Sequence, residues 1–546
     1  MTLPSRIAGA LAKLPPAHTF EVSVERDLVS KMPDGAELLA DRWYPTNVGA
    51  GLPPTVLLRS PYGRRQLGMF GRLMAERGYQ VVIQSCRGTF GSAGEWEPFR
   101  NEERDGKATQ AWIASQPWFD GQLATFGPSY LGLTQWFVAQ DPPDYLKAMA
   151  LTVTASRVTD SIIYPGGSLG LESLLTWVNT VDSQENGLLA MVKNMRRAPG
   201  AVARAAKVLP LSKGDTAIVG HPVPFYQDWI SHNEPGDEWW DLVDHSKDRT
   251  KIPPAALLGG WYDLFLWGQV RDYEALVAAG RKARLTIGPW THASPGSIGE
   301  TLRDALAFFD EQLKGRPANP DPVRLFVMGS KKWQSFAQWP PAAEQQRWYL
   351  GRGGTLSPEG TDAGPADRYR YDPSDPTPSV GGPSLLGQAA GPKDQKSRER
   401  RGDVVTYTSA PMRSDLTVVG PLTATLHLRA SLEHTDFFVR LCDVSPKGTS
   451  TNLSDGIVRL TPGAVSKGED GTFELTISMW PTANAFLAGH RVRLQVSSGA
   501  HPLFVRNPGS GEPLGSATTL VASDQEIWHD ETHQSFITLP VVRSGQ

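Results

Sequence analysis

Ser129 lies in the segment FGPSYLG (126–132), between the short apolar run LATFG and the helical stretch LTQWFVAQ. A serine on a sharp strand-to-helix turn has its hydroxyl exposed above the edge of the sheet. The first N–H groups of the following helix have no intrahelical partners, and the Tyr130 N–H is expected to stabilise a developing oxyanion. The usual Gly-x-Ser-x-Gly elbow is altered, because position 131 is Leu and the second glycine follows at Gly132. The pattern predicts a nucleophilic serine.

Two further segments supply the groups that such a serine needs. Asp263 follows the apolar run AALLGG, and His292 follows the run ARLTI. An imidazole must take the serine proton, and a carboxylate fixes the imidazole tautomer. Alone, His292 would be interpreted as an ordinary loop residue. The carboxyl ends of parallel strands meet at one edge of a sheet, and the order Ser, Asp, His is that of α/β-hydrolases. The three residues therefore predict a catalytic triad.

The elements around the triad alternate between strand and helix patterns. Apolar runs at 54–62, 79–88, 123–127 and 148–153 are separated by helical stretches at 65–78 and 103–116, which predicts a parallel sheet with right-handed crossovers. The strand signal then fades into a predicted helical cap and later returns. We therefore expect four segments: a first hydrolase part at 1–155, the cap at 156–247, a second hydrolase part at 248–345 and a β-sandwich of jelly-roll type at 346–546.

The C-terminal segment differs from the rest of the chain in composition and in hydrophobic pattern. A Gly/Pro/Asp-rich stretch at 351–395 precedes alternating runs such as LTATLHLRAS and HRVRLQVSSG. Short alternating strands with regular turn signals are typical of sandwiches and jelly rolls. The charged cluster KSRERR (396–401) is interpreted as solvated surface.

Composition excludes several classes of function. The chain has 546 residues, which predicts more than one domain, and a net charge of -3, which leaves no basic excess for nucleic acid. Two cysteines, Cys86 and Cys442, cannot form a disulfide framework or a zinc cluster. No apolar run is long enough to span a membrane, and no export signal is apparent at the N-terminus. We expect a cytoplasmic protein without nucleic-acid or membrane partners, and without a metal or organic cofactor.

The motifs together resemble the CocE/NonD hydrolases of peptidase family S15, which include cocaine esterases and X-prolyl dipeptidyl-peptidases. The resemblance rests on RSPYGR, SCRGTFGSAGEW, WFDGQLATFGPSYLG, GGWYDLF, GPWTHAS, GDVVTYTSAP and DGIVRLTPG, in this order along nearly the whole chain. YPGGSLGLESLLTW and VRLFVMGSKKW are most similar to the cocaine-esterase branch. The resemblance implies an α/β-hydrolase fold with a helical cap and a C-terminal jelly roll. It leaves a homodimer open, because relatives commonly self-associate.

The resemblance also implies roles for residues outside the triad. Tyr62, in SPYG, matches a tyrosine whose hydroxyl is the second oxyanion donor. Trp177 and Phe265 match positions that line an aromatic acyl site, and Leu385 and Leu386 are expected to contribute from the jelly-roll side. In the related α-amino acid ester hydrolases an acidic pair soon after the triad aspartate binds the substrate ammonium. Here an apolar run, LFLW, follows Asp263.

The predicted function is therefore that of a serine carboxylic-ester hydrolase acting on small esters with uncharged aromatic or aliphatic acyl groups. An unpartnered ammonium buried against an apolar wall would cost several kcal/mol. Three alternatives stay open: an amidase, acylase or X-prolyl dipeptidyl-peptidase-like activity on the same triad; acyl transfer to an alcohol or amine; and a carbohydrate- or ligand-binding protein organised around the jelly roll.

Overall fold

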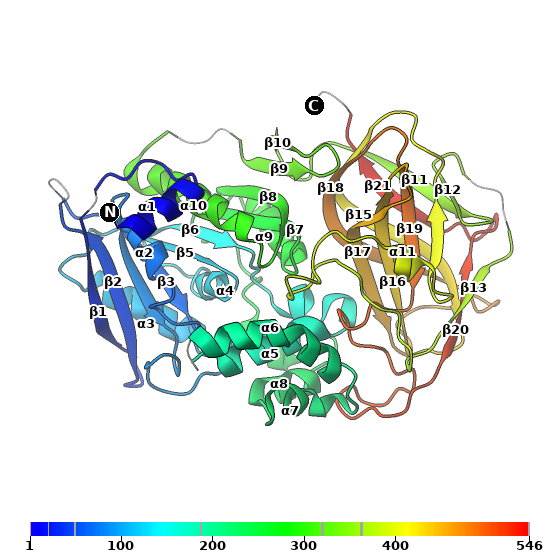
Figure 1. Cartoon of the computed structure of the whole chain (residues 1–546), viewed down its shortest axis with the longest axis horizontal. Coiled ribbons are helices and arrows are strands. Elements are labelled where there is room, and N and C mark those ends of the chain that lie inside the picture. Colours follow the sequence, from blue (N-terminus) through cyan, green and yellow to red (C-terminus); the bar gives the residue numbers. More distant parts are fainter. Residues whose placement is uncertain are drawn as a thin grey trace.

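The computed structural model describes residues 2–19, 21–47, 51–185, 188–317, 321–360 and 364–543, with backbone only at 188–195. A ten-stranded sheet forms the left half of Figure 1, in the order β1-β2-β4-β3-β5-β6-β7-β8-β9-β10. Its strands are β1 (Val22–Lys31), β2 (Glu37–Pro45), β3 (Thr55–Ser60), β4 (Gln80–Ser85), β5 (Leu123–Pro128), β6 (Leu146–Thr152), β7 (Ala255–Tyr262), β8 (Ala283–Thr291), β9 (Val323–Val327) and β10 (Lys332–Phe336).

The centre of this sheet is parallel, as the strand and helix alternation predicts. Strands β4, β3, β5, β6, β7, β8 and β9 pair in parallel, whereas β2 pairs antiparallel with both β1 and β4, and β10 pairs antiparallel with β9. The N-terminal hairpin was not predicted. Its first strand, β1, has only one buried residue, so it lacks the continuous apolar run of the parallel strands.

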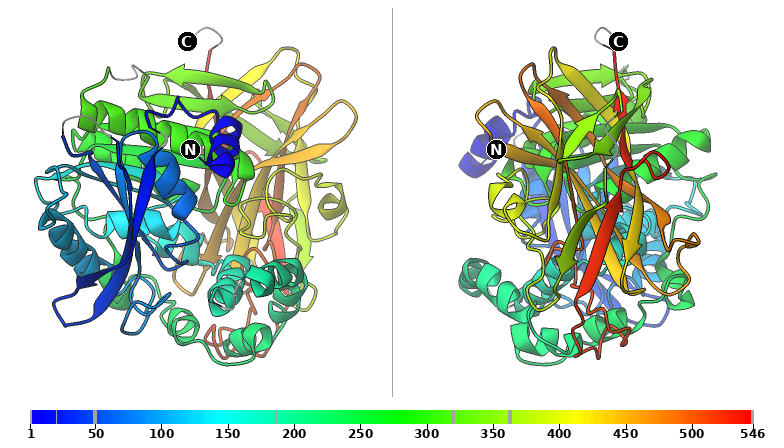
Figure 2. Two further views of the ribbon diagram at one scale, coloured as in Figure 1. Left: turned by 60° about the vertical axis from the view of Figure 1, so that its left-hand side comes forward. Right: turned by 90° about the vertical axis from the view of Figure 1, so that its right-hand side faces the viewer.

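Helices cover both faces of the sheet (Figures 1 and 2). Along β3, Val56 and Leu58 pack in one cluster with residues of α2 and α10, whereas Leu57 packs on the other face with Ile113 of α3. This alternation is the strand period of two. The hydrolase helices are α1 (Leu3–Leu11), α2 (Gly68–Ala75), α3 (Glu102–Ala114), α4 (Tyr130–Trp136), α9 (Leu266–Ala278) and α10 (Pro295–Lys314).

A helical cap is inserted between β6 and β7 and lies below the sheet and the jelly roll in Figure 1. Its α-helices are α5 (Leu171–Ser183), α6 (Leu188–Ala205), α7 (Gly214–Val219) and α8 (Pro224–Ser231). Short helical turns flank them, at Thr159–Ile163, Pro165–Gly167, Leu211–Lys213 and Glu238–Val243. No helix in the described parts of the chain is long and apolar enough to cross a membrane.

The C-terminal part is an eleven-stranded sheet folded into a sandwich. Its strands are β11 (Glu344–Gly351), β12 (Thr355–Ser357), β13 (Asp367–Tyr371), β14 (Val405–Thr408), β15 (Leu416–Ala430), β16 (Thr435–Val444), β17 (Ser450–Leu460), β18 (Phe473–Phe486), β19 (Arg491–Ser497), β20 (Ser523–Trp528) and β21 (Phe536–Val541). One continuous apolar core joins these strands to β7, β8 and β9 of the first sheet. The rings of Trp267 and Trp480 meet across this boundary, 5.4 Å apart.

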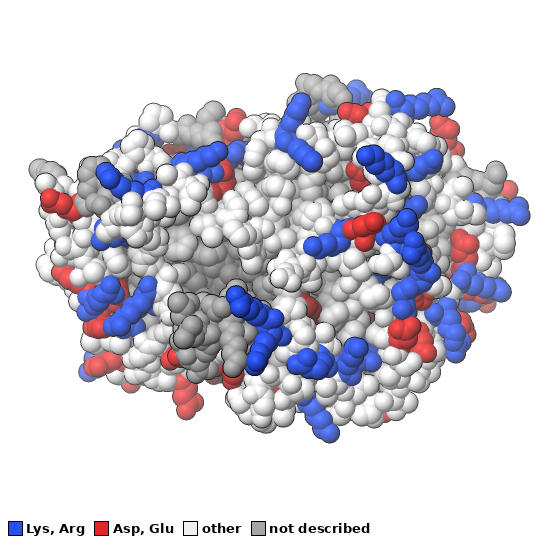
Figure 3. All heavy atoms as spheres, viewed as in Figure 1, with Lys and Arg blue, Asp and Glu red and all other residues white. Residues whose placement is uncertain are grey.

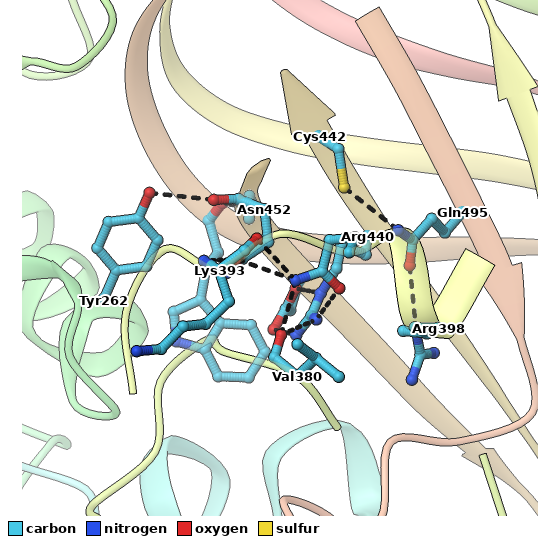
Figure 4. A network of polar contacts seen from close by, with 12 residues as sticks. Tyr262, Val380, Lys393, Arg398, Arg440, Cys442, Asn452 and Gln495 are labelled. Atoms are coloured by element: carbon cyan, nitrogen blue, oxygen red, sulfur yellow. Dashed lines mark hydrogen bonds and ion pairs between the residues drawn. The ribbon is translucent and has the colours of Figure 1, made fainter. Parts of the chain in front are cut away.

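The interpretation of KSRERR as solvated surface is wrong for Arg398, whereas Lys396, Ser397 and Arg400 are exposed. This segment forms the short helix α11 (Lys396–Glu399), and the Arg398 side chain is fully buried. Arg398 donates to Gln495 Oε1 (3.1 Å) and to Ser497 Oγ (2.6 Å) of β19. Figure 4 shows this contact at one end of a polar network that fixes the segment before β14. A run of charged residues does not reveal that hydrogen-bond acceptors about a hundred residues further along the chain bury one of them.

Candidate active site

The structure brings Ser129, Asp263 and His292 together at the carboxyl edge of the parallel strands. His292 Nε2 lies 3.0 Å from Ser129 Oγ, and its Nδ1 lies 2.7 Å from Asp263 Oδ2. Asp263 is completely buried. These contacts have the lengths of hydrogen bonds and the connectivity by which a carboxylate orients an imidazole toward a serine hydroxyl.

The turn between β5 and α4 holds Ser129 in a strained conformation. Its φ is +57°, a region that non-glycine residues rarely adopt and that is found at nucleophile elbows. The Ser129 N–H donates to the Thr152 carbonyl at the end of β6 (2.9 Å). Gly132 allows the helix to approach this strand end, because a Cβ there would lie 2.4 Å from Thr154 Cγ2. The displaced second glycine thus has a packing role.

Asp263 and His292 stand just beyond β7 and β8. The second carboxylate oxygen of Asp263, Oδ1, accepts from the Phe265 N–H (2.8 Å), so both oxygens have fixed partners. The Phe265 ring lies 5.5 Å from the His292 ring. The turn after β8 is closed by a hydrogen bond from the Thr291 N–H to Ser294 Oγ (2.9 Å). Two strand ends and two short turns therefore set the imidazole orientation.

Tyr62 lies two residues beyond β3, and its hydroxyl is already oriented. The Trp177 indole N–H donates to the Tyr62 hydroxyl oxygen (3.1 Å), which leaves the phenolic hydrogen available for another acceptor. Burial raises the pKa of Tyr62 to about 12, so the phenol stays protonated at neutral pH. Tyr130 differs, because its hydroxyl donates to Glu102 (2.9 Å) inside the protein. Only its backbone N–H, the first of α4, remains for the site.

A cavity of about 870 Å³ opens above Ser129 and His292. Trp177, Phe265, Leu385 and Leu386, the four expected acyl-site residues, all line it. Its other apolar or aromatic lining residues are Tyr62, Phe99, Tyr130, Leu133, Ile162, Ile163, Leu174, Ala198, Pro199, Trp229, Leu264 and Ala293. The lining of the cavity thus comes from three parts of the chain: the hydrolase domain, the cap and the segment that leads into the jelly roll.

Sequence reasoning missed the aromatic stack behind Trp177. The rings of Phe99 and Trp177 are 6.0 Å apart at an angle of 3°, and those of Trp177 and Trp229 are 5.5 Å apart at 11°. Phe99 lies in a turn without any periodic pattern, and Trp229 lies on α8 among other aromatic residues. The sequence carries no signal that sets them apart from ordinary core residues.

The charged residues that line the cavity bear on which substrates it can hold. Among the described residues, no Asp or Glu lines it, and Arg196 is the one charged lining residue. On the face shown in Figure 3 the molecule is hollowed above the cap helices, and Lys or Arg side chains border the hollow on its lower side. A substrate ammonium would find no counter-ion among these lining residues.

The fold and the hydrogen-bonded trio define a serine hydrolase of the α/β-hydrolase class. Two family models match this chain: X-Pro dipeptidyl-peptidase (S15 family) over residues 34–294, and the X-Pro dipeptidyl-peptidase C-terminal non-catalytic domain over 317–538. The chain is 33% identical over 580 aligned positions to cocaine esterase of Rhodococcus sp. (strain MB1 Bresler), covering 95% of this chain and 99% of that esterase. The chain belongs to the S15 family and to its CocE/NonD hydrolases, as the motifs predict.

Solved structures share the fold over nearly the whole chain. An α-amino acid ester hydrolase superposes with a TM-score of 0.80 at 22% identity, covering 97% of this chain and 98% of that one. A CocE/NonD family hydrolase from Staphylococcus aureus superposes with a TM-score of 0.69 at 18% identity, covering 97% and 99%. The predicted combination of α/β-hydrolase fold and mostly-sheet C-terminal domain is confirmed.

Proposed function

We propose that this hydrolase cleaves small carboxylic esters with uncharged acyl groups through an acyl-enzyme on Ser129. The observation that carries the proposal is the position of His292, hydrogen-bonded to both Ser129 and Asp263 beneath a cavity whose described lining contains no acidic residue. The identity to a named esterase supports the same reaction class.

The proposed first half-reaction forms the acyl-enzyme. Ser129 Oγ attacks the ester carbonyl as its proton passes to His292 Nε2. The carbonyl oxygen becomes an oxyanion that the Tyr62 hydroxyl and the Tyr130 N–H stabilise. His292 then returns the proton to the departing alkoxide, so the alcohol leaves neutral. Asp263 stabilises the imidazolium throughout.

The second half-reaction releases the acid. His292 takes a proton from water, whose oxygen attacks the acyl carbonyl, and then gives the proton back to Ser129 Oγ. The same two donors stabilise the second oxyanion. An alcohol or amine in place of water would give acyl transfer.

The lining of the cavity supports uncharged acyl groups over the alternatives that require an ammonium. X-prolyl dipeptidyl-peptidase-like cleavage would bring a substrate N-terminus into a cavity whose described lining offers no carboxylate. Amide cleavage of an uncharged substrate remains the second candidate, since the triad serves both leaving groups. Matched ester and amide substrates separate the two, and a preference for the amide would overturn the ester proposal.

For setting and partners, we propose a cytoplasmic enzyme whose partner is a small-molecule substrate. Cys86 and Cys442 are both free and buried, which fits a reducing compartment. Whether the protein forms a homodimer is tested by its mass in solution, for example by light scattering.

The test is hydrolysis of p-nitrophenyl acetate, butyrate and benzoate by wild type and by Ser129→Ala. We expect the variant to lose at least 10⁴-fold in kcat, about the loss typical of triad members. Ser374→Ala, which removes an exposed turn hydroxyl that donates to Asp372 outside the cavity, is the matched control and should retain most activity. Equal rates in wild type and Ser129→Ala, or no rate in either, would favour the ligand-binding alternative or another class of substrate.

A further inference from the structure

Glu172 is a buried carboxylate that the proposed mechanism does not use. It lies in the first turn of α5, five residues before Trp177, and is 3% exposed. Glu172 has no arginine or lysine partner within the described residues. Its two oxygens instead accept consecutive backbone N–H groups, Oε2 from Leu385 (3.0 Å) and Oε1 from Leu386 (2.9 Å). Thr176 Oγ1 also donates to Oε1 (3.0 Å).

Leu385 and Leu386 lie in a loop, residues 382–391, that is closed at its base. Gly382 and Gly391 exchange two backbone hydrogen bonds of 2.9 Å each. The base is fixed to the jelly roll by the network in Figure 4. There Asn452 Nδ2 donates to the Gly391 carbonyl (3.2 Å), and Arg440 Nη1 donates to the Val380 carbonyl (2.5 Å).

The far end of the 382–391 loop is held differently from its base. The hydrogen bonds that tie the Leu385 and Leu386 N–H groups to the rest of the protein end on Glu172, on the cap. Both leucines line the cavity above Ser129. Glu172 is therefore the polar anchor of this wall on the cap, in addition to the apolar packing of both leucines in the cluster that includes Trp177.

We propose that Glu172 is a specificity-determining positioning residue, which fixes Leu385 and Leu386 as the far wall of the acyl cavity. The proposal rests on the proposed esterase function for its substrate readout, but its structural part does not. A carboxylate suits this role because each of its two oxygens can accept an N–H. Glutamine offers one acceptor oxygen and one donor NH₂ group, so Glu172→Gln keeps the size of the side chain and loses at least one of the two backbone bonds.

The ratio of kcat/KM for a large acyl group to kcat/KM for a small one reports the position of the wall formed by Leu385 and Leu386. Ser129, Leu385 and Leu386 line the same cavity, so we expect a large benzoyl group to contact the leucines more than a small acetyl group does. We expect Glu172→Gln to lower kcat/KM for p-nitrophenyl benzoate at least tenfold, mainly through KM, and for p-nitrophenyl acetate less than threefold. Glu76→Gln is the matched control, since Glu76 is also fully buried but accepts from Ser5 in the hydrolase domain. Its benzoate-to-acetate ratio should equal that of wild type.

Amide hydrogen exchange resolved at Leu385 and Leu386 tests the contact without any substrate. In wild type both amides should exchange slowly, and in Glu172→Gln at least one should exchange ten times faster while the amides of β15 stay unchanged. An unchanged benzoate-to-acetate ratio in the folded variant would overturn the specificity role. Rapid exchange of both amides in wild type would overturn the positioning role, even if Glu172→Gln failed to fold. A wild type inactive on every ester, with both amides protected, would contradict the esterase function and leave the positioning role standing.

Discussion

At the scale of single residues, the Tyr62 hydroxyl has one hydrogen to donate, and Trp177 decides where it points. The Trp177 indole N–H donates to the Tyr62 hydroxyl oxygen, so the phenolic hydrogen of Tyr62 must go to a different acceptor. A carbonyl oxygen acquires most of its negative charge in the transition state, so such a donor contributes more to kcat than to binding. Trp177 thus both lines the cavity above Ser129 and orients the hydroxyl of Tyr62, the proposed oxyanion donor.

Tyr62→Phe should therefore lower kcat by about 10²- to 10³-fold and change KM little, the usual effect of losing one oxyanion donor. The measurement is the steady-state rate of p-nitrophenyl acetate hydrolysis. Tyr79→Phe controls for the loss of a buried phenol, because the Tyr79 hydroxyl donates to Asp310 (2.6 Å) outside the cavity. A mutant that loses only affinity, with kcat intact, would remove Tyr62 from the oxyanion site.

At the scale of elements, the cap is seated on the jelly roll by close backbone contact. Gly166, in the turn Pro165–Gly167 before α5, has φ +59°, and a Cβ there would lie 1.8 Å from the Ile457 carbonyl oxygen of β17. Backbone atoms cannot move aside as a flexible side chain can. The approach of the two elements therefore requires glycine at this position.

Gly166→Ala should shift the cap and destabilise the protein more than Gly220→Ala. Gly220 has φ +91° and nothing within 4 Å of a built Cβ, so its alanine variant suffers conformational strain alone, about 1–2 kcal/mol. Gly166→Ala adds a steric clash, which we expect to cost about 1–3 kcal/mol more. Urea unfolding of the two variants gives the comparison. Equal losses would mean that the cap accommodates the methyl group without moving.

The elements that carry the triad could be predicted from the sequence because each one is local. The strand before Ser129, the strand before Asp263 and the strand before His292 are short apolar runs that end in turn residues. The antiparallel hairpin of β1 and β2 could not be predicted in the same way, because all but one residue of β1 are exposed or only partly buried and the strand lacks such a run.

The groups that hold the acyl wall could not be predicted, because their partners are distant in sequence. Glu172 and Leu385 are 213 residues apart in the sequence, and neither segment contains a pattern that predicts the contact. Burial of Arg398 depends in the same way on acceptors in β19. Leu385 and Leu386 themselves were identified through the family resemblance, which preserves long-range information that hydrophobic periodicity does not contain.

At the scale of the whole molecule, buried histidines that are neutral in the folded state make the free energy of unfolding depend on pH. His245, where the cap returns to the sheet, is 5% exposed and lies 4.4 Å from the Phe137 ring. Burial lowers the pKa of His245 to about 4 from 6.5, and that of His501 in the jelly-roll half also to about 4. A histidine that protonates more readily in the unfolded chain stabilises the fold above pH 6.5, and this contribution is lost as pH falls from 6.5 toward 4.

His245→Gln should therefore make the acid side of the stability curve shallower. Each unit of pKa shift corresponds to about 1.4 kcal/mol, so the His245 contribution to acid destabilisation is up to about 3 kcal/mol. The measurement is urea unfolding at several pH values between 7 and 4. His221→Gln is a control of opposite sign, since hydrogen bonds to the Pro222 carbonyl and to Asp182 raise the pKa of the exposed His221. Parallel curves for wild type and His245→Gln would show that folding does not change the pKa of His245.

The proposed mechanism requires that Ser129 becomes covalently acylated during turnover. Acylation is measured as the mass of the protein and of its Ser129 peptide after acid quench during hydrolysis of p-nitrophenyl benzoate, with His292→Ala and Ser129→Ala alongside. We expect one benzoyl group on Ser129 in wild type, and none at that position in either variant. A benzoyl adduct on another residue that turns over at the catalytic rate, or turnover that persists in Ser129→Ala, would contradict the proposed mechanism.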